Sequence, residues 1–320
     1  MKTLYIIGNG FDIAHGLNTS YWNFREFLAE NHQEFLQMFE EQYSITSIDL
    51  LDERISENAR KEWENHIKRE LWSEFENKMG QPNIPEMLDF SESLLSGMNL
   101  DSGLTQIEDT MDSYWEKEYG YIREFERYVK EWIESVDTED VQPRRRDLIE
   151  STDYFLNFNY TDLLESVYEI DDILHIHGGV YSVASTEPIM GHCNDRGIEE
   201  HLGWAKESEE KFDEGDASIH RAVANYLRSI YKDTRNIIRS NQMFWDKLKD
   251  VNEVIIIGWS AGSADMPYLR KVKESVRENT KWLVYYYDNR AISALKKAMS
   301  DEEIEERYEV RYIPIGEFWD

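Results

Sequence analysis

The sequence predicts an α/β fold in which a mostly parallel sheet carries large helical insertions. Six short runs of β-branched and aromatic residues favour strands, and they cover Thr3–Gly8, Asp153–Asn159, Asp172–Gly178, Glu253–Ser260, Lys281–Asp288 and Glu309–Ile315. The segments Leu4–Ile7 and Val254–Ile257 are nearly continuous apolar runs, as is typical of strands covered on both faces. Helical patterns follow the fourth and fifth runs, over residues 263–278 and 291–300. This alternation of strand and helix favours a Rossmann-like arrangement of layers.

A long stretch without a convincing strand separates the first two runs. Thr19 or Ser20 can cap a helix, because the apolar residues that follow recur mostly at intervals of three and four: Trp22, Phe24, Phe27, Leu28, Phe35, Leu36 and Phe39. Further helices are predicted around 59–79 and 116–136. We therefore predict an α/β core made of residues 1–28 and 151–320, with a helical insertion or cap over 29–150. A second helical block, 218–250, falls inside the predicted core.

Five cations stand out in that second helical block. They are spaced by 7, 4, 3 and 4 residues, which predicts one face of a single helix: Arg221, Arg228, Lys232, Arg235 and Arg239. Such a stripe either pairs with the acidic surface of the insertion or borders a site for a phosphate group.

Charge and cysteine content narrow the class of protein. The chain has 35 Lys and Arg against 65 Asp and Glu, a net charge of −30. This surface repels polyanions, so nucleic-acid binding and attachment to an anionic membrane are not expected. The chain has one cysteine, Cys193, so it has no internal disulfide and suits a reducing compartment. With no long apolar run and no signal-peptide pattern at its beginning, we expect a soluble, cytoplasmic protein.

The segment Gly8-Asn9-Gly10-Phe11-Asp12 follows the first strand directly. Glycines allow a sharp turn and a close approach to a ligand, and the exposed amides of such a turn favour an anion. The dinucleotide pattern GxGxxG is incomplete, because Ile13 stands at the third glycine. No phosphate loop ending in GK[ST] is present. An ordinary dehydrogenase and a P-loop NTPase are therefore not supported.

The segment Gly258-Trp259-Ser260-Ala261-Gly262 matches the GxSxG pattern after a strand. In an α/β-hydrolase this serine is the nucleophile, and the catalytic histidine follows it in the chain. Here the last histidine is His220, so the order of residues excludes that triad. Ser260 is predicted to be a polar group at the carboxyl end of a buried strand.

Histidines gather around the third strand. Period-two alternation predicts that His175 and His177 share one face of it. Together with His192 and Cys193 they have the ligand types of a zinc site. Adjacent residues 192 and 193 would converge poorly with both histidines, so no metal is expected. The simpler interpretation is one catalytic histidine beside one packed histidine.

Asparagines end the second strand, in Asn157-Phe158-Asn159-Tyr160-Thr161-Asp162. Asn157 and Asn159 share a face, and Thr161 or Asp162 can cap the next helix. Such residues often only cap and turn the chain. However, four predicted strands now end in polar loops, and ligands of open α/β sheets bind at the carboxyl ends of strands. The coincidence of the four ends is a stronger signal than any one motif.

These segments together resemble the AbiH family of phage abortive-infection proteins. The resemblance is most specific over residues 6–28, continues over 156–165, 173–178 and 255–269, includes Trp72–Glu76 and spans nearly the whole chain. It implies a phage-defence protein.

The same segments are similar, more distantly, to the NAD-binding core of sirtuin-like proteins. This resemblance implies that Asn159 serves the nicotinamide ribose and that His177 is the base. The residues that it implies for cofactor binding are Gly8, Asn9, Gly10, Phe11, Asp12, His15, Leu17, Thr19, Gly258, Ser260 and Asp265. Thr161 departs from the family aspartate, with Asp162 displaced by one. Phe11, Asp12 and His15 replace a loop of small residues.

The resemblance implies NAD hydrolysis rather than deacetylation of protein lysine, because one cysteine cannot form the zinc ribbon of the deacetylases. His177 would accept a proton near neutral pH. The amides of Gly8–Phe11 would hold the diphosphate, and Asp12 would orient His15 or a ribose. Two alternatives remain open: a nucleotide-binding sensor or interaction module without catalysis, and a toxin that acts on a partner through its acidic helical insertion. The expected partners are a nucleotide and a phage trigger or a second copy of the chain.

Overall fold

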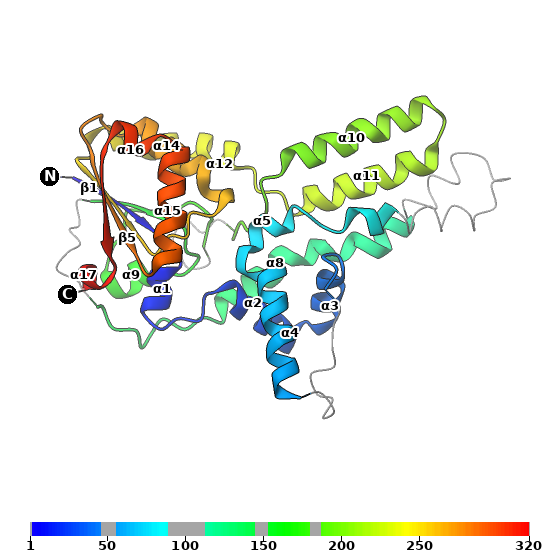
Figure 1. Cartoon of the computed structure of the whole chain (residues 1–320), viewed down its shortest axis with the longest axis horizontal. Helices are drawn as coiled ribbons and strands as arrows, with labels where there is room; N and C mark the ends of the chain where they lie inside the picture. Colours follow the sequence, from blue (N-terminus) through cyan, green and yellow to red (C-terminus); the bar gives the residue numbers. More distant parts are fainter. Residues whose placement is uncertain (1, 46–55, 89–112, 145–152, 180–186, 320) are drawn as a thin grey trace. The chain divides into compact units, whose positions relative to one another are not determined.

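The computed structural model describes residues 2–45, 56–88, 113–144, 153–179 and 187–319. They fall into two compact units (Figure 1). The α/β unit consists of residues 1–23, 129–189 and 233–320, and the helical unit of 24–128 and 190–232. This division differs from the predicted ranges at 190–232, which the sequence pattern assigned to the core, and at 129–150, which it assigned to the insertion. Within the described residues, no helix is long and apolar enough to cross a membrane.

The α/β unit contains one sheet of six strands, all parallel. Its strands confirm the six predicted runs, each one slightly shorter: β1 (Thr3–Ile7), β2 (Tyr154–Asn157), β3 (Ile173–His175), β4 (Glu253–Ile257), β5 (Lys281–Tyr286) and β6 (Glu309–Pro314). The spatial order is β3-β2-β1-β4-β5-β6, the order of a doubly wound Rossmann sheet. The predicted fold class is therefore confirmed.

The register places the carboxyl ends of the central strands at one level. Ile7 of β1 pairs with Asn157 of β2 and with Ile257 of β4, and Asn157 pairs in turn with His175 of β3. The chain order of the strands reverses between β1 and β4. In sheets of this kind, ligands bind beyond the carboxyl ends at that reversal, the switch point.

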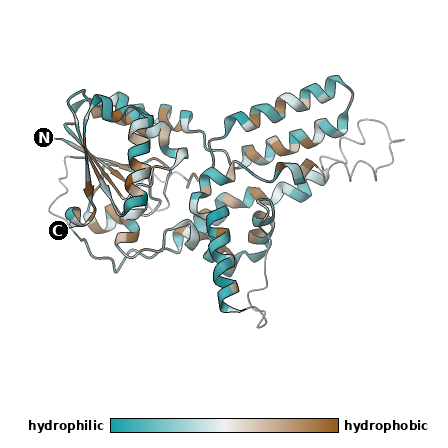
Figure 2. Cartoon of the chain, in the orientation of Figure 1, coloured by the Kyte–Doolittle hydropathy of each residue, from teal (hydrophilic) through white to brown (hydrophobic). Residues whose placement is uncertain are grey.

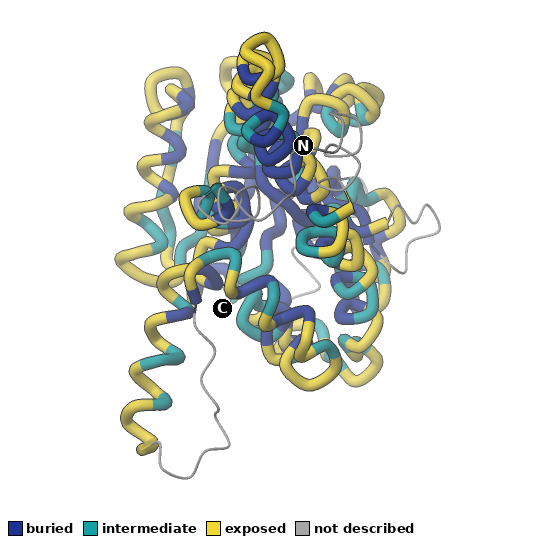
Figure 3. Tube along the Cα trace, turned by 90° about the vertical axis from the view of Figure 1, so that its right-hand side faces the viewer, coloured by how far each residue is buried: buried dark blue, intermediate teal, exposed yellow. Residues whose placement is uncertain are grey.

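Apolar side chains cover both faces of the sheet. On one face, Leu4 and Ile6 pack with α14 (Met266–Ser275) and α15 (Asn289–Asp301). On the other, Tyr5 and Ile7 pack with α9 (Leu163–Tyr168) and with α1 (Gly10–Ala14) and α17 (Gly316–Trp319). The strands are correspondingly brown in Figure 2, and β1, β2 and β4 are almost wholly buried (Figure 3). The remaining helices of this unit are α12 (Thr234–Ser240), α13 (Gln242–Lys247), η4 (Leu248–Asp250), η5 (Ser263–Asp265) and α16 (Ile304–Arg307).

The helical unit is built around aromatic side chains. Its elements are α3 (Gln33–Glu41), α4 (Glu57–Glu70), η1 (Trp72–Glu74), α5 (Phe75–Met79), η2 (Gly120–Glu124), α10 (Asp195–Glu210) and α11 (Glu214–Ser229), and the unit boundaries fall inside α2 (Tyr21–Asn31) and α8 (Phe125–Glu134). Phe24 contacts Phe75 and Phe125, with ring centroids 6.2 and 5.9 Å apart. The helix predicted through Phe39 is two helices, because His32 leaves the helical conformation.

The pair α10 and α11 belongs to the helical unit because its core residues pack there. Val223 and Leu227 of α11 share a cluster with Met87 and Trp115. Sequence alone could not show this, since the two partners lie more than a hundred residues earlier in the chain.

The predicted stripe of five cations on one helix face is wrong. The helix α11 ends at Ser229 and α12 begins at Thr234, so the helical periodicity breaks inside the stripe. Lys232 is fully buried, with its Nζ 2.8 Å from Oε1 of Glu76, and Arg221 pairs with Glu209. Of these two partners, only Glu76 lies in the predicted insertion, and it is buried rather than on an acidic surface.

Candidate functional site

The loops after β1 and β4 pack backbone against backbone at the switch point. The amide of Gly8 donates to the carbonyl of Ile257 at 2.9 Å, and the amide of Gly10 to that of Gly258 at 2.8 Å. A Cβ at Gly8 would lie 2.5 Å from Cα of Trp259. Gly258 has a φ of +65°, and a Cβ there would lie 2.4 Å from the amide nitrogen of Phe11. The fold itself therefore requires these glycines, before any ligand is considered.

The same contacts engage the amides that the sequence assigned to a diphosphate. Besides Gly8 and Gly10, Phe11 donates its amide to the carbonyl of Gly8 at 2.9 Å. The helix that follows, α1, has five residues, so it contributes little dipole. Three of the expected backbone donors thus serve the loop, and any diphosphate here needs other groups to hold it.

Three further predicted site residues hold the first loop in shape. The side-chain Nδ2 of Asn9 donates to the carbonyl of Thr19 at 2.8 Å. In return, the Thr19 hydroxyl donates to Oδ1 of Asn9 at 2.6 Å. Leu17 is buried in the apolar cluster below the sheet. Gly16 has a φ of +85°, which allows the turn between them.

His15 is held by groups other than Asp12, so the first of the two predicted roles of Asp12, orienting His15 rather than a ribose, is wrong. The His15 Nδ1 lies 2.8 Å from the carbonyl of Phe11, and its Nε2 lies 2.7 Å from the hydroxyl of Tyr168. A carbonyl accepts a hydrogen bond, so Nδ1 carries the proton and Nε2 accepts from the tyrosine. Burial lowers the pKa of His15, which agrees with a neutral ring.

The carboxyl group of Asp12 instead faces the loop after β2. Its Oδ1 accepts a hydrogen bond from Nδ2 of Asn159 at 2.6 Å, and its Oδ2 accepts one from Oγ1 of Thr161 at 2.7 Å. All three side chains are buried. Burial raises the pKa of Asp12 to about 7, although the two hydrogen bonds act in the opposite direction. Near neutral pH this carboxyl group therefore exists in both protonation states.

Asn159 joins the two loops. Its Nδ2 also lies 3.3 Å from the carbonyl of Gly8, and its backbone amide donates to Oδ1 of Asn157 at 3.1 Å. Its own Oδ1 is buried and has no hydrogen-bond partner within the part of the chain that the structure describes. Buried polar atoms are nearly always paired, so this bare acceptor indicates a group that is still to bind.

The two histidines do not share a face, contrary to the prediction from strand periodicity. The strand β3 ends at His175 and the chain turns there, with the amide of Gly178 donating to the carbonyl of His175. The His175 Nε2 lies 2.7 Å from Oε1 of Glu165, and Nδ1 lies 3.2 Å from the carbonyl of Asn159. Burial lowers the pKa of His175, but the hydrogen bond and charge of Glu165 outweigh it, so the net shift is upward.

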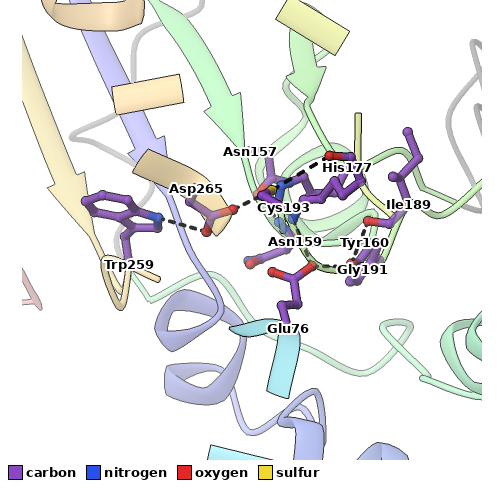
Figure 4. Close-up of polar contacts among 11 residues, drawn as sticks. Glu76, Asn157, Asn159, Tyr160, His177, Ile189, Gly191, Cys193, Trp259 and Asp265 are labelled. Atoms are coloured by element: carbon purple, nitrogen blue, oxygen red, sulfur yellow. Dashed lines mark hydrogen bonds and ion pairs between the residues drawn. The ribbon is translucent and has the colours of Figure 1, made fainter. Parts of the chain in front are cut away.

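His177 lies on the other side of the turn, among aromatic rings. Phe158, Tyr160 and Tyr268 surround it, with ring centroids 5.2 to 6.2 Å away. Its Nε2 lies 3.2 Å from Oδ1 of Asp265, and Oδ2 of the same carboxylate accepts a hydrogen bond from the indole of Trp259 at 3.2 Å (Figure 4). Asp265 therefore connects the loop after β4 with the loop after β3.

The described contacts thus form two pairs, Asp12 with Asn159 and His177 with Asp265, and the four residues come from four different strand ends. Ser260 is exposed. Among the described residues, no group of three or more His, Cys, Asp or Glu side chains is arranged to hold a metal ion.

Sequence analysis missed the roles of two residues that contact this site. Thr161 was noted as a possible helix cap and as a departure from a family pattern, but its spacing to Asp12 gives no local signal for the hydrogen bond between them. Glu165, which contacts His175, was not singled out. A search for a hydroxyl donor to the buried carboxyl group of Asp12 would have identified Thr161.

Comparison with known proteins gives one match. A family model described as "Bacteriophage abortive infection AbiH" matches residues 4–286. No curated protein and no solved structure matches the chain. The match covers all four polar strand ends and most of both units, and it supports a role in abortive infection. This chain belongs to the AbiH family of bacteriophage abortive-infection proteins.

Proposed function

We propose that the chain acts in abortive infection by binding NAD, or a closely related nucleotide, at the switch point of its sheet and hydrolysing the nicotinamide–ribose bond. One observation carries the proposal. The bare, buried Oδ1 of Asn159 lies at the sheet edge where nucleotides bind in this fold, and the loops of that edge also carry His177 and Asp265.

The chemistry makes modest demands on the protein. Water adds to the anomeric carbon, the bond to neutral nicotinamide breaks, and ADP-ribose, nicotinamide and one proton are released. The centre that develops is oxocarbenium-like, so the protein must hold the ribose and accept a proton. The Asn159 oxygen suits a ribose hydroxyl, since an amide oxygen accepts hydrogen bonds. His177 suits the proton, because the carboxylate of Asp265 lies 3.2 Å from its Nε2 and would stabilise the charged ring.

The net charge of −30 disfavours an anionic ligand over most of the surface. Local groups must therefore offset the charge of a diphosphate. Arg144 is exposed and donates to the carbonyl of Ala14 at 3.1 Å, while its guanidinium stacks on Trp319. It thus places a cation at the end of α1, the helix that follows β1.

The experiment is direct: purified protein is incubated with NAD, and released nicotinamide is quantified by chromatography. Asn159→Ala and His177→Ala should each lower the rate at least 100-fold, in the range for positioned acid–base groups. The matched controls are Asn279→Ala, at an exposed turn residue just before β5 and therefore at the amino edge of the sheet, and His66→Ala, at an exposed residue of α4 in the helical unit. Both controls should keep the wild-type rate.

Each result has a definite meaning. Binding of NAD without turnover would replace the hydrolase by a nucleotide sensor. Turnover that survives both substitutions would place the chemistry elsewhere. If wild-type protein neither binds nor consumes NAD, and both variants still protect cells from phage, the proposal is wrong.

A further inference from the structure

We infer that Asp12 and Thr161 form an orienting clamp, which fixes the amide of Asn159 so that its oxygen is presented to the ligand and the site selects a ligand carrying a hydrogen-bond donor. The identity of the ligand rests on the proposed function, and there the donor is a ribose hydroxyl. Asp12 is here a positioning residue that acts through Asn159.

Two acceptors determine which way the amide lies. Oδ1 of Asp12 is 2.6 Å from Nδ2 of Asn159, and the carbonyl of Gly8 is 3.3 Å from the same nitrogen. Rotating the amide by half a turn would bring its oxygen against both acceptors. Two unpaired acceptor contacts inside a buried site are costly, so only one orientation is compatible with the loops as they pack.

Thr161 determines how Asp12 faces Asn159. Its hydroxyl donates to Oδ2 of Asp12 at 2.7 Å, which leaves Oδ1 toward Asn159. When Asp12 is protonated, a proton on Oδ2 can donate to Oγ1 of Thr161, because a hydroxyl both donates and accepts. The Oδ1 atom then remains an acceptor, so the clamp holds in either protonation state. His175 and Asp162 are the other charged groups that act on this carboxyl.

The clamp has a cost that only a ligand relieves. With Nδ2 committed to Asp12 and Gly8, Oδ1 of Asn159 is left buried without a partner within the described chain. A hydroxyl or an N–H of a ligand pairs it, whereas a ligand that offers only acceptors leaves it bare. The site should therefore discriminate strongly against a nucleotide that lacks the hydroxyl.

The test measures binding of ADP-ribose by calorimetry to wild type, Asp12→Asn, Asp12→Leu and Thr161→Val. Asn at position 12 can still accept from Asn159 through its oxygen and donate to Thr161 through its nitrogen, so affinity should stay within about threefold of wild type. Leu removes the acceptor, and affinity should fall about tenfold or more. Thr161→Val removes the hydroxyl that orients Asp12 but leaves the carboxyl group in place, so the loss of affinity should lie between those of the two Asp12 variants, about threefold to tenfold.

A ligand analogue isolates the hydrogen bond itself. Deoxy analogues of ADP-ribose, each lacking one hydroxyl of the terminal ribose, are measured against the same proteins. For one of them, wild type should prefer ADP-ribose about tenfold, and Asp12→Leu should not discriminate. Equal discrimination by both proteins would overturn the inference.

A second readout needs no ligand. In protein labelled with ¹⁵N at asparagine, the side-chain amide protons of Asn159 should exchange slowly in wild type and in Asp12→Asn, and at least tenfold faster in Asp12→Leu. Unchanged protection in Asp12→Leu would overturn the clamp. If wild type fails to bind ADP-ribose while protection follows this pattern, the proposed function fails and the clamp stands.

Discussion

Asp12→Asn should make the stability of the α/β unit less dependent on pH. Asp12 is buried at 1% exposure, and its pKa rises from 3.8, the ordinary value for a solvated aspartic acid, to about 7 in the fold. The unfolded chain loses this proton at a lower pH than the folded chain does. Above the unfolded pKa, stability therefore falls as pH increases, until the folded group also ionises near pH 7. Asparagine has the same shape and no proton to lose.

The size of the effect follows from the shift. A rise of about 3 pKa units corresponds to about 4 kcal/mol between the two limits of pH. The sequence pI is about 4.6, and proteins tend to associate where their net charge is near zero. The unfolding measurements therefore start at a pH above this value. Linkage then gives a loss of about 2 kcal/mol for wild type relative to the variant, between about pH 5.5 and about pH 8.5.

The assay is urea unfolding followed by tryptophan fluorescence, with the free energy of unfolding determined at several pH values. Asp171→Asn, which changes an exposed carboxyl group, is the control and should give a curve parallel to wild type. If Asp12→Asn is also parallel to wild type over the whole range, the carboxyl group does not carry the raised pKa, and the argument from burial is refuted.

Three further predictions concern neighbouring contacts. Gly10→Ala should cost about 1–3 kcal/mol of stability, because its Cβ would lie 2.7 Å from Cα of Gly258. The control Gly203→Ala, at an open position in α10, should cause no such loss. Equal unfolding midpoints for Gly10→Ala and wild type would contradict this prediction. Glu165→Gln should lower the pKa of His175 in an NMR titration, since the charge beside its Nε2 is removed; an unmoved titration would show that Glu165 does not raise it. Wild-type stability that depends on this raised pKa is present below about pH 6.5 and is lost as pH rises through the folded value. Lys232→Met should lower the free energy of unfolding by about 3–5 kcal/mol, because it leaves Glu76 buried without its cation, and adding Glu76→Gln should restore most of this loss. Thermal unfolding of the single and double variants measures both effects. A double variant as unstable as the single one would contradict the role assigned to the Lys232–Glu76 pair.

The fold was largely predictable because its signals are local. Continuous apolar runs such as Val254–Ile257 identify buried parallel strands within a few residues. Polar loops at four strand ends then indicate where a ligand would lie, since the ends of parallel strands meet at one edge.

The contacts inside the site were not predictable, because they depend on geometry between distant segments. Asp12 meets Asn159 and Thr161 across about 150 residues of chain, and no spacing rule covers such a distance. His175 and His177 are separated by a turn that falls inside the predicted strand, because β3 ends at His175 and the prediction continued it to Gly178. Gly8 and Gly10 were singled out for a close approach to a ligand, and the close approach that the structure shows is to the loop after β4.

The central claim is that the switch point of this sheet binds a nucleotide, and the small molecules that co-purify with the protein test it most directly. Wild-type protein is isolated from cells, denatured, and its released ligands are identified by mass spectrometry beside Asn159→Ala and the control Asn279→Ala. The account predicts NAD or ADP-ribose with wild type and with the control, and its loss from Asn159→Ala. Wild-type and control protein that release no nucleotide, or an Asn159→Ala variant that releases as much as wild type, would contradict it.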